Sequence, residues 1–338
     1  MADAPPAVTL ALHPENDLYH LSTLLTGLIA LRQSGEISLS VSVEPRHDPA
    51  YGAVYRLLAR CGTSAVRCTI DVADRSDFWD VVGFRQSDVY LKRSYWPTRL
   101  PAGVRPFGLN YASRPPGLPA MAIRMLWSLL RRGAARGLRA YLHSPPATTL
   151  EWPPEATREP KIVFQSRLWE GAAGGPDVDR INDERISLAR ALRRTFGNRF
   201  LGGIIRTAVA ERLCPDAISP LPSRHGAYAR WSRAAAIGVY TRGLHDSIAF
   251  KLPEYFANGK AVVAQGIPRD IVLPAPLTAG REYVAFSALD DCVATCEGLL
   301  THPRDARGLG EAAWEYYRCE CAPTAMARRV VRTMGLGN

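Results

Sequence analysis

The sequence lacks any long apolar run and any secretory leader. Its longest apolar stretch, 21–31, is interrupted by four small or polar residues and is shorter than the roughly 20 residues that a membrane-spanning helix needs. The chain starts Met-Ala-Asp-Ala-Pro-Pro, without the basic and apolar regions of a signal peptide. We therefore expect no transmembrane segment and a cytoplasmic protein.

The sequence also lacks a cysteine framework. Its seven cysteines are an odd number scattered along a long chain, which argues against structural disulfides. Cys292 and Cys296, and likewise Cys319 and Cys321, have no histidine or further cysteine at zinc-site spacing. The only D-x-D here, Asp177–Asp179, is a weak metal signal. We expect reduced thiols and no metal.

Acidic residues are scarcer than basic ones, and the net charge is +10. Arginines cluster in two places, as Arg124, Arg131, Arg132, Arg136 and Arg139, and as Arg328, Arg329 and Arg332. Such clusters are typical of contact with an anionic membrane surface, a lipid-phosphate acceptor or nucleic acid. A solvated helix face explains them equally well.

The length of 338 residues favours two domains of roughly 150 residues each. A proline-rich stretch, SPPATTLEWPPEATREP, begins at Ser144 and has the composition of a linker. We predict a first domain over 1–158 that includes the linker 144–158, a second domain over 159–310, and a C-terminal helix over 311–338 that crosses back to the first.

Strand and helix patterns alternate in both halves. The first half gives strands at 8–12, 37–43, 66–72, 89–91 and 104–109, and helices at 18–31, 51–60 and 120–142. The second gives strands at 161–165, 200–205, 237–241, 261–265 and 283–286, and helices at 185–196, 251–258 and 289–300. This alternation predicts an α/β fold of two doubly wound Rossmann-like lobes that face each other across a ligand-binding cleft.

The segment 237–265, IGVYTRGLHDSIAFKLPEYFANGKAVVAQ, is the most informative. It predicts a strand, a polar loop, a glycine-terminated helix and a second strand. Free amides from Ser247 to Lys251, with the charge of Lys251, would suit a diphosphate at the helix N-terminus. Glu254 can accept hydrogen bonds from a ribose diol, and Asp246 can reach a sugar's hydroxyls.

Asp246 and Glu254 are eight residues apart, and Glu254 opens the run EYFANGKAVV. This arrangement resembles the E-x7-E and E-A-x-A-x-G-x-P-V-V patterns of group 1 (family 4-like) glycosyltransferases with the GT-B fold. Arg167, in FQSRL, resembles the arginine of that family's V-G-R-L segment. The resemblance covers 161–300, with departures at Asp246, at Ser247-Ile248 and at Ala261.

The resemblance implies that Arg167 and Lys251 neutralise the diphosphate, Glu254 holds the ribose, and Asp246 contacts the transferred sugar. The predicted donor contacts are Arg167, His245, Ser247, Ile248, Ala249, Phe250, Lys251 and Glu254. The resemblance further implies a UDP-, GDP- or ADP-linked sugar as donor, retention of the anomeric configuration, and no requirement for a metal or further cofactor.

Residues after the first-lobe strands are candidates for the acceptor side. His13 and Asp17, with Glu15, follow the first strand and suit acceptor contact or general-base catalysis, although such a loop is also a good turn and helix cap. Lys92 and Arg93 could bind an acceptor phosphate, and Asn110 and Tyr111 have similar positions. The aromatic group Trp314, Tyr316 and Tyr317 is expected to pack.

The leading interpretation is sugar transfer from a nucleoside diphosphate sugar to an unidentified acceptor, which is a glycan, a lipid-linked molecule, a small molecule or DNA. One alternative is a DNA glycosyltransferase that uses the basic surface. Another is a degenerate GT-B module that binds without transfer, as the altered acid motif suggests.

Overall fold

The structure is a computed structural model that describes residues 5–44, 52–117, 120–131, 135–156, 158–170 and 177–336, with the backbone alone at 120, 121 and 135–137. Arg132 and the side chain of Arg136 therefore lie outside the described residues. The chain divides into two compact units: Met1–Thr148, Asp270–Pro276 and Cys319–Asn338 form unit 1, and Thr149–Arg269 and Leu277–Arg318 form unit 2.

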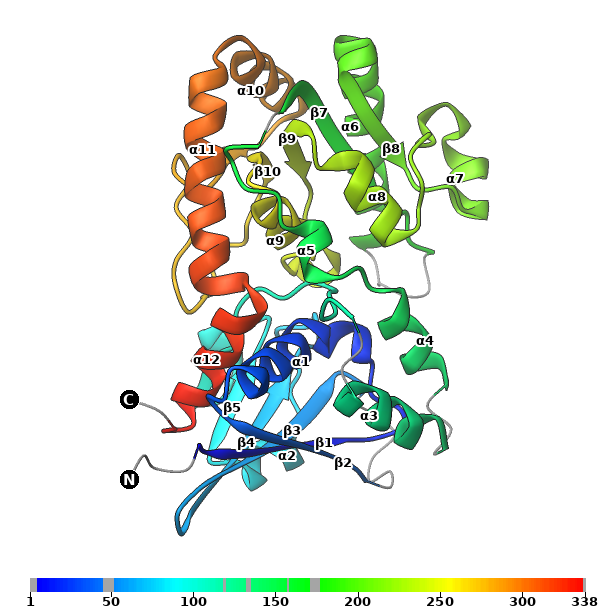
Figure 1. Ribbon diagram of the computed structural model, residues 1–338. Helices are drawn as coiled ribbons and strands as arrows, with labels where there is room; N and C mark the ends of the chain where they lie inside the picture. Colours follow the sequence, from blue (N-terminus) through cyan, green and yellow to red (C-terminus); the bar gives the residue numbers. More distant parts are fainter. Residues whose placement is uncertain are drawn as a thin grey trace. The chain divides into compact units, whose positions relative to one another are not determined.

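Unit 1 is built on a six-stranded sheet of order β2-β1-β3-β4-β5-β6 (Figure 1). Its strands are β1 Ala7–Leu12, β2 Ser38–Val43, β3 Val54–Cys61, β4 Ser64–Asp71, β5 Val89–Lys92 and β6 Val104–Pro106. Its helices are α1 Leu18–Gln33, α2 Val81–Gln86, α3 Ala120–Arg131, α4 Ala135–His143 and α12 Pro323–Thr333. All neighbouring strands are parallel except that β3 is antiparallel to β1 and β4.

One predicted helix of unit 1 is wrong. The range 51–60, predicted as a helix, contains β3, because alternate residues such as Tyr55, Leu57 and Ala59 are buried with the period of a strand. Gly62, at φ 58°, turns the chain into β4. Within the range 120–142, predicted as one helix, the structure describes α3 and α4, and residues 132–134 between them lie outside the described residues.

The core of unit 1 lies where α1 and α12 pack together on the sheet. Asp17 caps α1, since its carboxylate accepts the amide of Tyr19 at 2.9 Å. Gly27 makes the helix contact possible: a Cβ there would overlap the carbonyl of Pro323 at the start of α12. Glycine is needed at this close approach.

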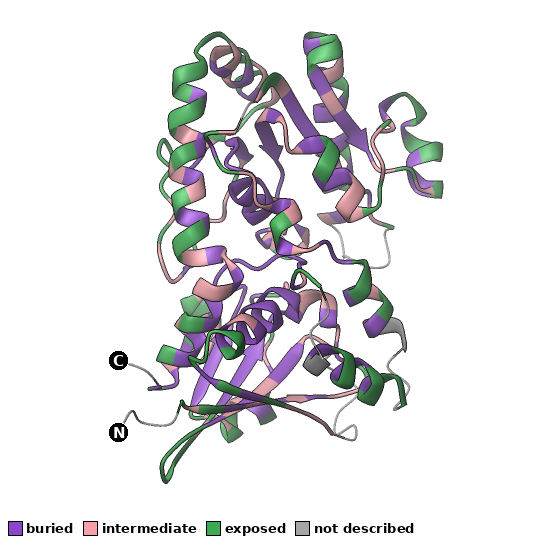
Figure 2. Cartoon of the chain, viewed as in Figure 1, coloured by how far each residue is buried: buried purple, intermediate pink, exposed green. Residues whose placement is uncertain are grey.

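Unit 2 is a parallel five-stranded sheet of order β11-β10-β9-β7-β8. Its strands, largely buried in Figure 2, are β7 Glu159–Ser166, β8 Phe200–Ile204, β9 Ala235–Tyr240, β10 Ala261–Gln265 and β11 Val284–Phe286. Its helices are α6 Val178–Phe196, α7 Ala208–Leu213, α8 His225–Ser232, α9 Lys251–Ala257, α10 Leu289–Thr301 and α11 Pro303–Tyr316; α5 Ala147–Leu150 spans the division between the units.

The winding direction of unit 2 reverses between β7 and β9. From β7 the chain passes through α6 to β8 on one side, and from β9 through α9 to β10 on the other. Right-handed crossovers in opposite directions place α6 and α9 on opposite faces of the sheet. The sheet is therefore doubly wound, which confirms the predicted α/β class for this unit.

The aromatic group at the end of α11 packs as predicted. Trp314 and Tyr317 stack with ring centroids 5.4 Å apart, and Tyr316 meets Phe256 edge-on at 5.7 Å. Among the described residues, no helix is long and apolar enough to cross a membrane.

Candidate functional site

In open α/β sheets, ligands bind at the carboxyl ends of the strands where the winding direction reverses. In unit 2 this point lies at the carboxyl ends of β7 and β9. Arg167 follows β7 and is exposed, and Thr241 to Asp246 follow β9. Arg185, a buried residue of α6, ties the two loops together by donating to the carbonyls of Arg167 at 2.6 Å and Arg242 at 2.9 Å. No sequence motif pointed to Arg185.

The loop after β9 carries backbone strain. His245 and Asp246 have φ of 55° and 56°, and no other described residue except glycine has a positive φ. The Gly243 amide donates to the Ser247 carbonyl at 2.9 Å, which closes the loop. Left-handed conformations at consecutive non-glycine residues cost free energy and cluster at functional sites. The predicted His245-Asp246 pair therefore lies on a strained turn.

Arg242 fixes Asp246 within a cluster of carboxylates. Its guanidinium, 9% exposed, lies 2.6 Å from Asp177, 2.8 Å from Asp246 and 3.4 Å from Glu184. The hydrogen bond from Arg242 lowers the pKa of Asp177 to about 2, against the opposing effect of burial. The first aspartate of the D-x-D is thus bound to arginine, and no metal-binding group of three acidic, histidine or cysteine side chains occurs among the described residues.

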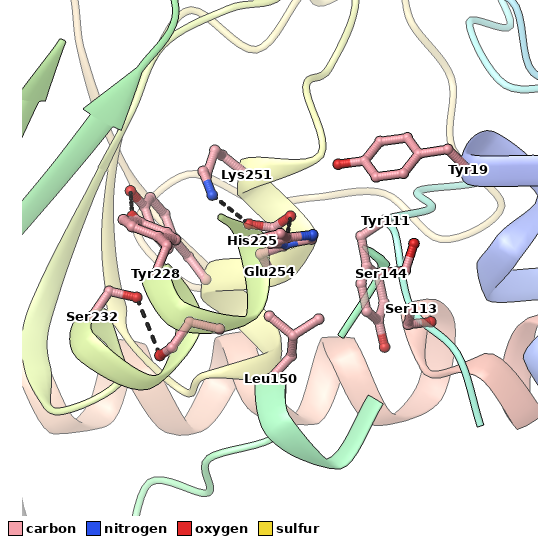
Figure 3. A network of polar contacts seen from close by, with 12 residues as sticks. Tyr19, Tyr111, Ser113, Ser144, Leu150, His225, Tyr228, Ser232, Lys251 and Glu254 are labelled. Atoms are coloured by element: carbon pink, nitrogen blue, oxygen red, sulfur yellow. Dashed lines mark hydrogen bonds and ion pairs between the residues drawn. The ribbon is translucent and has the colours of Figure 1, made fainter. Parts of the chain in front are cut away.

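Glu254, in α9, is held between Lys251 and His225 (Figure 3). Lys251 Nζ lies 2.6 Å from Glu254 Oε2, and His225 Nε2 lies 2.8 Å from Oε1. Lys251 also lies 4.0 Å from the ring centroid of Tyr228. His225 comes from α8, far from the predicted motif, and was missed because its pairing depends on how α8 and α9 pack.

The charge of Glu254 is stable despite its burial. Its side chain is 6% exposed. Burial alone would raise the pKa of this carboxyl, but the charges and hydrogen bonds of Lys251 and His225 outweigh it and lower the pKa to about 2. Glu254 is therefore an ionised acceptor at neutral pH. A carboxylate has about four lone-pair sites, and Lys251 and His225 contact one oxygen each.

The amides before α9 are not all free. The Ser247 amide donates to the Leu244 carbonyl at 3.0 Å, and the Ala249 amide donates to Tyr240 Oη at 2.9 Å. The predicted run of free amides is therefore wrong at these two residues, because the loop and the last residue of β9 satisfy them internally.

A polar hollow of about 570 Å³ opens at the carboxyl ends of β9, β10 and β11. Its lining includes Arg180, Glu184, Thr241, Gln265 and Ser287. The volume lies in the range of small-molecule sites. Gln265 Nε2 donates to Glu184 at 2.9 Å, which connects the hollow to the Arg242 cluster. A second hollow, of about 420 Å³, lies at the amino ends of β7 and β9.

In unit 1, His13 and Asp17 lie at the carboxyl end of β1, as predicted. The His13 amide donates to Asn16 Oδ1 at 2.8 Å. His20, in the first turn of α1, lies with Nδ1 3.5 Å from Asp17 Oδ2, and burial lowers its pKa despite that carboxylate. Asp17 is thus a helix cap, and His20 adds a neutral imidazole that the sequence patterns did not single out.

The predicted phosphate role of Lys92 is wrong. Lys92 is fully buried, and its Nζ donates to Asp71 Oδ1 at 2.9 Å. Tyr90 Oη donates to the other oxygen of the same carboxylate, Oδ2, at 2.8 Å. Arg93 is 5% exposed and paired with Asp74. Both cations are used to neutralise carboxylates at the ends of neighbouring strands.

Asn110 and Tyr111 are likewise core residues. They are 1% and 0% exposed. Asn110 donates to the His20 carbonyl at 2.7 Å, and the Tyr111 amide donates to Thr23 Oγ1 at 3.0 Å. Both residues hold α1 in place.

No family model and no curated protein matches the sequence. Among solved structures, the chain is similar to HepE from Anabaena in complex with UDP and glucose, with 9% identity and a TM-score of 0.48 over 96% of this chain and 99% of that chain. It is also similar to an α-glucosyltransferase in complex with UDP-glucose and DNA containing an abasic site, with 8% identity and a TM-score of 0.46 over 97% of this chain and 100% of that chain.

A further similar structure is TarM, at 12% identity and a TM-score of 0.36. That match covers 55% of this chain and spans 37% of the length of TarM. At these identities the likeness concerns the fold alone.

Proposed function

We propose that the protein is a glycosyltransferase that transfers a sugar from a nucleoside diphosphate sugar to an acceptor. The observation that carries the proposal is the ionised, buried carboxylate of Glu254 in α9, beside a strained loop at the reversal of the unit 2 sheet. An acceptor of fixed charge there suits a ribose diol, and the motif around it supports the same assignment.

In this proposal Arg167 and Lys251 face the diphosphate and stabilise it as the leaving group. Asp246 contacts the transferred sugar, in a position set by Arg242. Transfer retains the anomeric configuration and uses no metal. The other predicted contacts, His245 and Ser247 to Phe250, surround the donor.

The acceptor side is proposed for unit 1. His13, Asp17 and His20 lie near the carboxyl end of β1. A neutral imidazole at His20 can accept the proton of an acceptor hydroxyl. A transfer screen with glycan, lipid-linked, small-molecule and DNA acceptors identifies the class of acceptor.

Calorimetry with UDP, GDP and ADP tests the donor site. We expect one nucleotide to bind the wild type and to bind Glu254→Ala at least about tenfold more weakly, because two hydroxyl hydrogen bonds to a charged group are lost. Glu282→Ala is the matched control, since Glu282 is 3% exposed in the same unit and lies before β11, away from the carboxyl-end loops. Binding by no nucleotide, or equal binding in both variants, contradicts the assignment.

A further inference from the structure

One stretch of the chain is entirely without acidic residues. No Asp or Glu occurs between Asp88 and Glu151. The same stretch holds ten cations, Lys92, Arg93, Arg99, Arg105, Arg114, Arg124, Arg131, Arg132, Arg136 and Arg139, as many as the net charge of +10 of the whole chain. Lys92 and Arg93 are buried and paired with Asp71 and Asp74, so the positive surface charge of this stretch comes from its arginines alone, and no acidic residue of the stretch offsets it.

Helix α3, within this stretch, has an apolar face that the core does not cover. Its core face is formed by Ala122, Met125, Leu126 and Leu129, which are buried. Ile123, Trp127 and Leu130 are 43%, 59% and 45% exposed. At about 100° per residue these three side chains share one stripe, roughly 100° around the helix from the core face.

Basic side chains border the exposed stripe. Arg124 and Arg131 are exposed on the flank beyond it, and on α4 Arg139 and Leu142 are exposed as well. Among the described residues, Arg124, Trp127, Ser128 and Arg131 line a surface hollow of about 440 Å³. Two guanidinium groups beside such a hollow suit a phosphate group.

An exposed stripe of Ile, Trp and Leu beside arginines is the pattern of a helix that lies in a membrane interface. We propose that α3, extended by α4, is a docking surface for a bilayer of anionic phospholipid. The apolar stripe enters the interface while Arg124 and Arg131 meet lipid phosphates. Duplex DNA fits less well, since its phosphates would pair with the arginines and leave the apolar stripe in water. The proposal does not depend on the donor site.

Sedimentation with lipid vesicles tests the proposal on the full chain. We expect binding to vesicles of phosphatidylcholine mixed with phosphatidylglycerol, weaker binding to phosphatidylcholine alone, and a decrease with salt. The triple variant Ile123→Ser, Trp127→Ser, Leu130→Ser should bind the mixed vesicles at least about tenfold more weakly. Arg124→Gln and Arg131→Gln should each bind the mixed vesicles about fivefold more weakly than the wild type.

Matched controls separate this surface from exposure in general. Trp231→Ser removes a tryptophan that is 66% exposed on α8 of unit 2, and Arg212→Gln removes an exposed arginine of α7. Both should bind vesicles like the wild type. Because every substituted side chain is exposed, far-ultraviolet circular dichroism should be unchanged.

Three kinds of result would overturn the proposal. The first concerns vesicles: the wild type does not bind the mixed vesicles, or the triple variant binds them as well as Trp231→Ser does. The second is tight retention on duplex DNA that the serine substitutions leave unchanged, which would mark a nucleic-acid surface. The third is a wild-type dimer in sedimentation velocity that the triple variant dissociates, which would show that a second copy covers the stripe.

Discussion

Replacing Glu254 by glutamine removes a charge that Lys251 and His225 stabilise in the folded chain. In the wild type the pKa of this carboxyl is lowered from 4.5 to about 2 by Lys251 and His225, which outweigh the effect of burial. The gap between these two pKa values corresponds to about 3 kcal/mol of folding free energy at neutral pH. Because the side chain is 6% exposed, solvent screening reduces this value little.

The sign follows from the direction of the pKa change. A carboxyl whose pKa is lower in the folded state stabilises the fold above its unfolded pKa, and the stabilisation is lost as the pH falls through the folded pKa. The contribution of Glu254 should thus be complete above about pH 5 and decline toward pH 2. The free energy of unfolding of Glu254→Gln should be about 3 kcal/mol lower than that of the wild type at pH 7. Near pH 3 the difference should be less than half as large.

Urea unfolding followed by tryptophan fluorescence at a series of pH values measures this difference. Glu282→Gln is the control, since Glu282 is an equally buried carboxylate of unit 2. It measures how much the free energy of unfolding falls when a buried carboxylate elsewhere in the unit is lost. Lys251→Met should narrow the pH range over which the stabilisation by Glu254 is lost, since it removes one of the two groups that lower the pKa of Glu254. If the wild type and Glu254→Gln differ in free energy of unfolding by the same amount at pH 7 and at pH 3, the reasoning is refuted.

Three further changes have defined outcomes. Lys92→Met leaves the buried Asp71 without its cation and should lower the free energy of unfolding in urea by about 3–5 kcal/mol, whereas Lys92→Met with Asp71→Leu should recover most of it. Gly27→Val should destabilise by more than 2 kcal/mol, roughly the cost of overpacking, while Gly298→Ala, with no atom within 4 Å of its would-be Cβ, should unfold no more easily. His245→Gly should raise the melting temperature through about 1 kcal/mol of relieved strain; a lower melting temperature would contradict it.

The candidate site was predicted as far as it is contiguous in sequence. The strand, loop, helix and strand over 237–265 were placed within a residue or two, because apolar periodicity and glycine positions are local signals. Arg242 directly precedes the predicted loop and could have been singled out as an arginine at a strand end. Its pairing with Asp177 and Glu184 could not be predicted, since Asp177 directly precedes α6 and Glu184 lies within it, far from the loop in sequence.

The sequence by itself determined the α/β class, most of the strands and the acidic motif, since each depends on periodicity or spacing within one segment. Tertiary structure alone decided how the charges are used. Whether Lys92 meets a ligand or Asp71, and whether Glu254 is neutral or ionised, depends on strands and helices brought together from distant segments. Burial and Coulomb energy are set by those neighbours in space, which no local pattern of residues contains.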